Sequence, residues 1–556
     1  MRIKDYLSIL IIIVLTIETL FGQSKGKILF ENNCSSCHGI ENGSFGPKLG
    51  GVADVRLIPD IKKFIKNPIP FILKGDERTL LLLDKYKTEM PSFKHLKNKE
   101  IRSIVNFIIE ETDRLEVNAL STSDISKEEL NKRYAPAIKS SDLYIELEDY
   151  VQIPRTTEHL VDKGISTLRA AKHGLFIADQ MGKMYSISKG KAEVYFDLRA
   201  NTPDFIFTPS IGAGLASFDF HPNFQENGLM YTTHNEIFEG KSAINEGDWP
   251  DSLGTEQQWV IDEWYTDEPN RFPFKIKSKR EVLRINTPTF AHAGQDLKFR
   301  PNIDKNHSDY GLLFFGHGDG GTANLGLPQF SHHIHSALGS ILRIDPQGTN
   351  GVLSSYGIPV DNPFAKHSDP TIQKEIYAFG FRNPYRFCWN GDDMYVADIG
   401  EAAVEELNVV VSGGDYGWAN QEGIYGKDVA KDKTLMLERA DFGVNETILP
   451  VITYDHTDGN AISGGAVYKG EIELLKGKYV FGDIVKGKVF YTDPNYFQDG
   501  IYELKIRRDN EPTSIEELVG VNRTHLRIGY DEINHDIYFM TKPDNMLRKV
   551  VMAIQK

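Results

Sequence analysis

Hydrophobic and polar residues follow different periods in the two parts of this chain. Near the N-terminal end, apolar residues recur with the i, i+3, i+4, i+7 spacing of a half-buried helix, at Ile101, Ile104, Val105 and Ile108. Beyond about residue 156, glycine-punctuated runs of β-branched and aromatic residues replace this helical period. We therefore expect a small all-α domain followed by a large all-β region.

Paired strand-like runs recur six times in the β region, and each pair resembles the middle of a propeller blade. Six units joined by long loops predict a six-bladed β-propeller, with an irregular sandwich or two separate β domains as alternatives. A propeller gathers its loops at one mouth of a central channel, where a ligand can bind. The predicted pairs are 174–179 with 183–187, 228–232 with 281–285, 311–315 with 340–345, 393–398 with 406–410, 478–483 with 488–492, and 536–540 with 546–550.

The first residues have the pattern of a secretory leader. Arg2 and Lys4 precede an almost wholly apolar run over residues 7–17. This run is short for a membrane span, so we expect a signal peptide over residues 1–22 and a periplasmic or otherwise exported chain, with an uncleaved anchor as the alternative. In the mature chain we expect no stable membrane span. Residues 114–155 are expected to form a linker with some helix.

The net charge limits the classes of binding partner, and the cysteine count limits the roles of the thiols. The formal net charge of −15 argues against nucleic acid or an anionic membrane surface as a partner. The chain has only 3 cysteines, and Cys388 stands alone between two aromatic residues, as expected of a buried core thiol.

The other two cysteines belong to one motif. The segment Cys34-Ser35-Ser36-Cys37-His38 reads C-x-x-C-H, the attachment signature of a c-type haem. The two thiols would form thioethers with the haem, and His38 would bind the iron. Met90 precedes a proline and offers a thioether as second iron ligand, although a methionine is more often core filler.

The order of these features is typical of one domain family. The haem motif, Gly46-Pro47, Met90-Pro91 and the amphipathic helix follow one another as in class I cytochrome c domains, which residues 25–113 resemble. The resemblance implies covalent haem c on Cys34 and Cys37, with His38 and Met90 as axial ligands.

Loop segments of the β region carry a second resemblance. These segments are 214–224, 292–299 leading to 316–321, 377–384 and 398–418. The most specific parts are R-N-P and the D-x-G…E-E-x-N…G-G-x-Y-G-W segment that follows it. In this order, over residues 156–552, they resemble the soluble quinoprotein glucose/sorbosone dehydrogenase family, including its relatives similar to hedgehog-interacting protein. The resemblance implies a six-bladed propeller that uses pyrroloquinoline quinone (PQQ) and Ca²⁺.

The resemblance assigns roles to single residues. His292 matches the general base, which takes the substrate hydroxyl proton. Arg382 and Asn383 match the pair that contacts the quinone oxygens, where a guanidinium can stabilise developing negative charge. A purely structural role remains the alternative for each of them. Arg523 falls where the family places an arginine against a PQQ carboxylate.

Calcium ligands are implied in the same way. Gly400 and Glu401 match backbone carbonyls that hold Ca²⁺ beside the quinone, and such oxygens suit a hard cation. Glu406 and Tyr416 match positions at a second, structural Ca²⁺, although Glu406 can equally be a plain solvated carboxylate.

Departures from the family pattern leave two functions open. Gly212 stands in place of a glutamine, Ala291 in place of an aspartate, and Val485 near the place of a lysine, with Lys486 adjacent. The first function is a quinohaemoprotein dehydrogenase that oxidises an aldose or related sugar or alcohol and passes electrons through the haem to a redox acceptor, a cytochrome or a terminal oxidase. The alternative is a non-catalytic propeller that binds a sugar or a protein.

Overall fold

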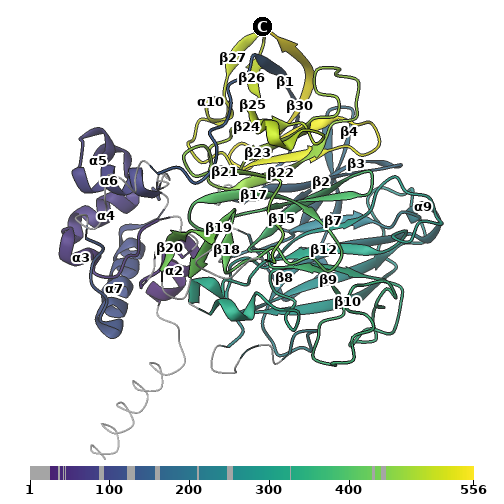
Figure 1. Cartoon of the computed structure of the whole chain (residues 1–556), viewed down its shortest axis with the longest axis horizontal. Coiled ribbons are helices and arrows are strands. Elements are labelled where there is room, and N and C mark those ends of the chain that lie inside the picture. Colours follow the sequence, from purple (N-terminus) through teal and green to yellow (C-terminus); the bar gives the residue numbers. More distant parts are fainter. Residues whose placement is uncertain are drawn as a thin grey trace, which may run out of the picture. The chain divides into compact units, whose positions relative to one another are not determined.

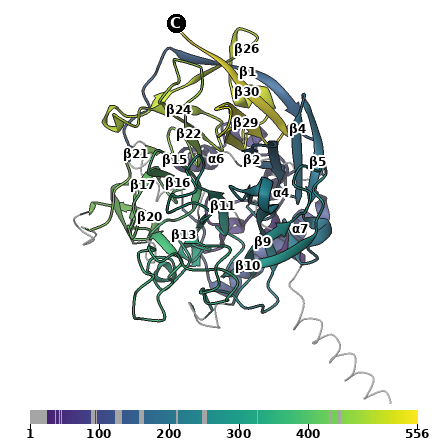
Figure 2. The same cartoon turned by 90° about the vertical axis from the view of Figure 1, so that its right-hand side faces the viewer.

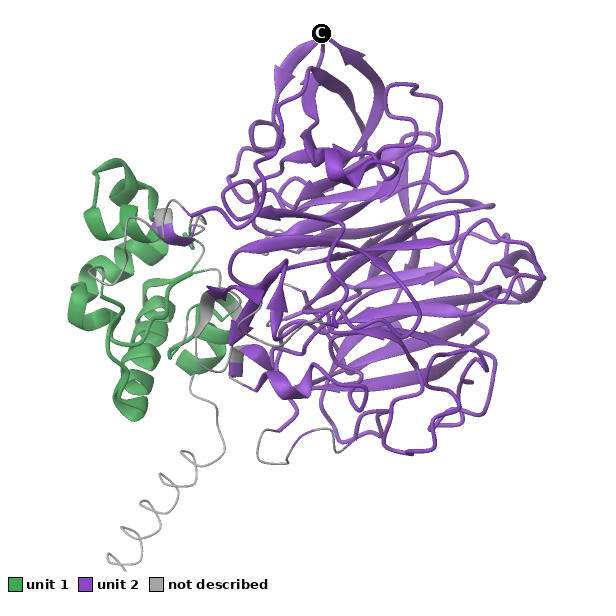
Figure 3. Ribbon diagram, in the orientation of Figure 1, with its two compact units in different colours: residues 1–82, 90–125 green, residues 83–89, 126–556 purple. Residues whose placement is uncertain are grey.

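The described residues form two compact units, which we treat separately (Figure 3). Residues 1–82 with 90–125 make one unit, and residues 83–89 with 126–556 make the other. The predicted leader over residues 1–22 and Cys37 of the haem motif lie outside the described residues. The computed structural model describes residues 25–35, 38–41, 43, 46–86, 90, 93–94, 96–121, 132–156, 163–208, 212–246, 249, 254–325, 327–428, 432–439 and 446–556.

The smaller unit is helical (Figure 1). Its longest helix, α7 (Asn98–Leu115), buries the four aliphatic residues that the sequence pattern predicted for its apolar face. Helices α2 and α4 pack against α7, and their apolar residues form one core with it. The helices that precede α7 are α2 (Lys25–Asn33), α3 (Val52–Val55), α4 (Ile58–Lys66), α5 (Ile69–Leu73) and α6 (Glu77–Tyr86).

In the larger unit, six strands from different sheets contact one another in a closed ring (Figure 2). Each of these inner strands begins a sheet and pairs antiparallel with the next strand of that sheet. In ring order they are β2 (Ile165–Ala171), β7 (Ser217–Phe220), β11 (Gly294–Phe299), β15 (Pro384–Asn390), β22 (Ile462–Val467) and β28 (Leu526–Tyr530).

Five of the six predicted strand pairs are confirmed, and every predicted run overlaps an observed strand. From β2 the sheet continues through β3 (Gly174–Asp179), β4 (Lys183–Ser188) and β5 (Lys191–Asp197); from β11 through β12 (Leu313–His317), β13 (Ser340–Ile344) and β14 (Ile376–Phe379). From β15 it continues through β16 (Asp393–Asp398), β17 (Val404–Val410) and β21 (Ile452–Asp455); from β22 through β23 (Tyr479–Asp483), β24 (Val489–Thr492) and β25 (Tyr502–Glu503). Strands β18 (Gln421–Glu422), β19 (Tyr425–Asp428) and β20 (Asp432–Leu437) form a separate small sheet.

One predicted pair is corrected by the structure. The run at 228–232 lies in β8 (Leu229–Ile237), but β8 pairs with β9 (Gln257–Tyr265), and only β9 pairs with β10 (Ser278–Thr287). Strand β9 lies between the two predicted runs, at 228–232 and 281–285. It is buried on both faces, so it lacks the polar alternation that marks a half-buried strand. A short strand, β6 (Phe205–Ile206), also pairs with β8.

The sheet that begins with β28 corrects the predicted linker. Strand β1 (Leu143–Gln152) falls within residues 114–155, yet it pairs antiparallel with β30 (Met546–Gln555) and parallel with β26 (Lys505–Arg508). Strands from the N-terminal and C-terminal parts of the larger unit therefore pair within one sheet of the ring. This sheet also contains β29 (Ile537–Thr541) and β27 (Glu511–Thr513).

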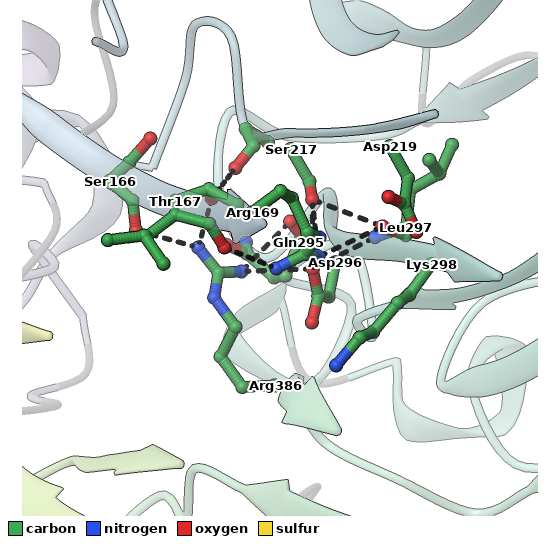
Figure 4. A network of polar contacts seen from close by, with 12 residues as sticks. Ser166, Thr167, Arg169, Ser217, Asp219, Gln295, Asp296, Leu297, Lys298 and Arg386 are labelled. Atoms are coloured by element: carbon green, nitrogen blue, oxygen red, sulfur yellow. Dashed lines mark hydrogen bonds and ion pairs between the residues drawn. The ribbon is translucent and has the colours of Figure 1, made fainter. Parts of the chain in front are cut away.

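A polar network crosses the centre of the ring (Figure 4). Arg169 of β2 donates to Asp296 of β11 at 2.5 Å, and Ser217 of β7 donates to the same carboxylate at 2.8 Å. Arg386 of β15 donates to Thr167 of β2 at 2.8 Å. These contacts join four of the inner strands. Thr167, Arg169, Asp296 and Arg386 also line a cavity of about 520 Å³. No helix in the described ranges is both long and apolar enough to cross a membrane.

Candidate functional site

The helical unit brings together parts of the predicted haem site. Cys34 is buried in the helical core, and Met90 packs against the same core. The Nδ1 atom of His38 lies 2.7 Å from the carbonyl oxygen of Pro47. This contact makes Nδ1 the donor and leaves the Nε2 lone pair for a metal. Burial lowers the pKa of His38, and the bond to Pro47 opposes that shift.

Gly46 closes the space beside this imidazole. A Cβ atom at residue 46 would lie 2.4 Å from Cε1 of His38, so any larger residue would collide with the ring. The Gly46-Pro47 pair thus positions the ring by close approach and by its carbonyl. The residues present fit a haem iron held through His38, and Met90 and Cys34 stay predicted as its other attachments.

In the larger unit, His292 forms a pair with a carboxylate. Its Nδ1 atom lies 2.7 Å from Oδ1 of Asp319, whose oxygens also accept from the N–H of Gly321 at 2.9 Å and from Nε1 of Trp418 at 3.2 Å. Burial opposes the charge of Asp319, but His292, Arg382 and the Gly321 N–H together lower its pKa. Asp319 therefore stays ionised and holds His292 with Nε2 as the free base.

Arg382 and Asn383 are fixed by a second buried carboxylate. Asp398, the last residue of β16, accepts from the backbone N–H of Arg382 at 2.9 Å and of Asn383 at 2.6 Å. The backbone N–H of Asp319 in turn donates to the carbonyl of Arg382 at 2.8 Å. The His292–Asp319 pair and the Arg382-Asn383 turn are therefore joined through the backbone.

Gly318 allows this close approach. A Cβ atom at residue 318 would lie 2.5 Å from the carbonyl oxygen of His292 and 3.0 Å from Oδ1 of Asn383. The glycine in the H-G-D segment is thus required by packing between two predicted site residues.

The predicted calcium residues lie among buried carboxylates. A Cβ atom at Gly400 would lie 1.8 Å from the carbonyl oxygen of Val404, so this position admits only glycine. The side chain of Glu401 forms an ion pair with the guanidinium of Arg382. The backbone N–H of Gly400 donates to Glu405 at 3.3 Å. Among the described residues, no group of three or more His, Cys, Asp or Glu side chains is arranged to hold a metal, so a cation here would depend on the backbone carbonyls of Gly400 and Glu401.

Glu406 is buried rather than solvated, which removes one of its two predicted alternatives. It faces Asp398 across the β16–β17 pair, and burial together with this neighbour raises the pKa of Glu406. Tyr416 is also buried, and its hydroxyl is bonded to the backbone of Val409 and Val411. Only the carbonyl of Tyr416 could then serve a cation.

Arg523 lines a cavity together with Asn460, Val485 and Lys486. The Nζ atom of Lys486 donates to the carbonyls of His456 and Thr457, both at 3.1 Å. Among the described residues, the buried Nε of Arg523 and Oδ1 of Asn383 have no hydrogen-bond partner. A polar cofactor bound here could supply the hydrogen-bond partners that these two buried atoms lack.

Sequence reasoning missed three contributors: Asp319, Asp398 and the side chain of Glu401. Asp319 lies in the G-H-G-D-G-G segment and Asp398 begins the D-x-G segment, so both aspartates belong to motifs that the sequence displays. Their partners were not visible, because His292 and Arg382 belong to other loops.

A closed ring of antiparallel sheets, with polar loops gathered at the ends of its inner strands, defines a propeller-type protein. Residues 164–508 match the family described as Glucose / Sorbosone dehydrogenase. The chain therefore belongs to the glucose/sorbosone dehydrogenase family. Residues 23–110 match the family described as Cytochrome c, and this domain implies haem c.

Individual relatives agree with this assignment. The chain is 27% identical to the HIPL1 protein of Arabidopsis thaliana over 384 residues, which cover 59% of this chain and 52% of that protein. It is 25% identical to quinoprotein glucose dehydrogenase B of Acinetobacter calcoaceticus over 233 residues, covering 38% of this chain and 40% of that protein. The chain spans about half the length of the curated relatives it matches.

A solved structure shares the fold. The soluble aldose sugar dehydrogenase from Escherichia coli, in its apo-form, superposes with a TM-score of 0.50 at 18% identity. The alignment covers 74% of this chain and 99% of that one.

Proposed function

We propose that this protein is an exported quinohaemoprotein dehydrogenase, which oxidises an aldose or a related sugar or alcohol with PQQ and passes the electrons to its haem c. The observation that carries the proposal is the joining of a glucose/sorbosone dehydrogenase domain and a cytochrome c domain in one chain. The propeller would have six blades, the ring supplying one inner strand to each. Ca²⁺ would bind at the carbonyls of Gly400 and Glu401.

The geometry suits proton removal from a substrate hydroxyl. PQQ, when bound, supplies the two-electron acceptor, and haem c supplies a one-electron carrier. With Nδ1 bonded to Asp319, the Nε2 atom of His292 is the base that would take the hydroxyl proton. Asp319 would then stabilise the imidazolium that forms. The guanidinium of Arg382 and the amide of Asn383 would orient the quinone oxygens.

Electrons and protons would leave by different routes. The electrons would pass to haem c and then to a downstream redox acceptor, a cytochrome or a terminal oxidase. The side chain of His292 is 15% exposed, so its proton can pass to solvent. Export would rest on the predicted leader over residues 1–22.

Reconstitution of the purified full-length protein tests the proposal. The protein is loaded with PQQ and CaCl₂, and haem absorbance is followed while aldoses and alcohols are added. We expect at least one sugar to reduce the haem. In His292→Ala the haem should stay oxidised with sugar while dithionite still reduces it. In Cys37→Ala, sugar should still reduce an artificial dye. If no sugar reduces either haem or dye in the loaded wild type, the proposal is wrong.

The non-catalytic alternative is favoured by the departures at Gly212, Ala291 and Val485. The side chain of Lys486 does not restore a lysine free for PQQ, because it is bonded to two carbonyls. This reading predicts no PQQ binding in calorimetric titration with millimolar Ca²⁺. A glycan or protein ligand would then bind at the loops, and the cytochrome would serve another partner.

A further inference from the structure

The carboxylate of Glu401 has a role that the family resemblance does not give it. That resemblance implies only a backbone carbonyl of this residue, at Ca²⁺. In the structure its side chain pairs with the guanidinium of Arg382, and each of the two side chains is only 2% exposed. The group expected to face the quinone oxygens is thus already engaged by a carboxylate of the protein.

Arg382 has little freedom to leave this position. A second guanidinium nitrogen donates to the carbonyl of Ile399 at 3.2 Å, and the Trp418 ring centre lies 5.7 Å from the guanidinium carbon. The backbone N–H is held by Asp398. A new anionic partner must therefore approach Arg382 where it stands, beside Glu401.

Such an approach brings like charges together. PQQ is a tricarboxylate at neutral pH, and a buried site screens repulsion between anions poorly. Glu401 would oppose an anionic quinone and compete with it for Arg382. A divalent cation could bind the backbone carbonyls of Gly400 and Glu401. These carbonyls belong to the same residue as the carboxylate and to the residue before it, so the cation would offset the charge of the carboxylate.

We propose that Glu401 couples the binding of calcium to the binding of the quinone. Without Ca²⁺, its carboxylate holds Arg382 and repels the quinone; with Ca²⁺, that charge is offset and Arg382 can share its donors. The inference rests on the proposed PQQ and calcium site and adds the residue that links the two ligands. Glu401 acts through Arg382 and is a positioning residue.

Calorimetric titration of the full-length protein with PQQ, in EGTA and in millimolar CaCl₂, tests the coupling. We expect wild type to bind PQQ at least about tenfold more tightly with Ca²⁺. Glu401→Gln should bind PQQ more tightly in EGTA than wild type does. The calcium ratio, which is the PQQ affinity in CaCl₂ divided by that in EGTA, should fall below about threefold in this variant. Glu375→Gln is the control, because Glu375 is equally buried but bonds Tyr356 in another part of the ring. It should keep the wild-type ratio.

The outcomes separate this inference from the proposed function. If wild type binds no PQQ even with Ca²⁺, the cofactor site itself is wrong. If wild type shows the calcium ratio and Glu401→Gln shows the same ratio, the coupling through Glu401 is wrong. Should Glu401→Gln fail to fold, Glu401→Asp keeps the charge but shortens its reach toward Arg382, and its calcium ratio must be smaller than that of wild type. An unchanged ratio in Glu401→Asp would then overturn the proposal.

Discussion

The Nδ1 atom of His292 lies 2.7 Å from Oδ1 of Asp319, and this hydrogen bond decides which imidazole nitrogen is free. His292 also adopts a left-handed backbone conformation, with φ of 47°. Such a conformation is uncommon for residues other than glycine and persists where the surroundings hold it. Here the N–H of Gly320 bonds the His292 carbonyl, and Asp319 bonds its ring.

The first prediction follows from this pair. Asp319→Asn should cut turnover about 10² to 10⁴-fold, because a neutral amide neither stabilises the imidazolium nor fixes the tautomer. PQQ affinity should stay within about threefold of wild type. Stopped-flow reduction of the haem by sugar, with calorimetry for PQQ, measures both. Asp361→Asn, at an exposed carboxylate bonded to Arg343, is the control and should turn over normally. Equal rates in Asp319→Asn and wild type would remove Asp319 from the mechanism.

A second prediction concerns packing at Gly318. Gly318→Ala places a methyl group 2.5 Å from the His292 carbonyl oxygen, so His292 and Asn383 must move apart. We expect a loss of about 1–3 kcal/mol in the free energy of unfolding and weaker PQQ binding. At Gly254, where φ is 74°, a Cβ atom would meet open space, so Gly254→Ala reports the cost of a left-handed backbone without a steric clash and should leave PQQ binding unchanged. Unchanged PQQ affinity in Gly318→Ala would show that this packing does not shape the site.

The third prediction concerns pH. Burial lowers the pKa of His317 to about 4, against about 6.5 in an unfolded chain. Between these values the unfolded state binds a proton that the folded state does not, so the free energy of unfolding falls as pH drops from about 6.5 to 4. Between pH 7 and pH 4.5, the free energy of unfolding of His317→Gln should therefore decrease less than that of wild type, by about 1–3 kcal/mol. Denaturant titrations at both pH values measure this.

His367, which is exposed, provides the control for that comparison. His367→Gln should follow the wild-type dependence on pH. If His317→Gln also follows it, the buried imidazole does not contribute to acid destabilisation.

The fourth prediction concerns haem ligation. Met90→His should lower the reduction potential and abolish the weak near-infrared sulfur–iron band, because imidazole replaces a thioether. Redox titration and near-infrared absorption of the haem-loaded protein measure both changes. A wild type without that band, together with an unchanged spectrum in Met90→His, would mean that another residue binds the iron.

Local patterns predicted the half-buried helix and most of the strands. The helical spacing of Ile101 to Ile108 located α7, and the runs at 174–179 and 393–398 coincide with β3 and β16. Strand β9 was missed because it is buried throughout and carries no polar alternation. In β1 the alternation of Leu143, Ile145 and Leu147 is short, because three exposed residues follow it at 148–150. A strand buried on both faces was predicted only where glycine or other turn residues mark its ends, as they do at the starts of β3 and β16.

By itself, the sequence determined the residue types of the site: a C-x-x-C-H motif, a histidine, an Arg-Asn pair and glycines at fixed spacing within each loop. Only the tertiary structure decided which residues meet. The partner of His292 is Asp319, that of the Arg382 side chain is Glu401, and Asp398 holds the backbone of Arg382 and Asn383. These contacts join loops that follow different strands of the ring. Their geometry is set by closure of the inner strands and by long-range packing, which no local pattern of residues encodes.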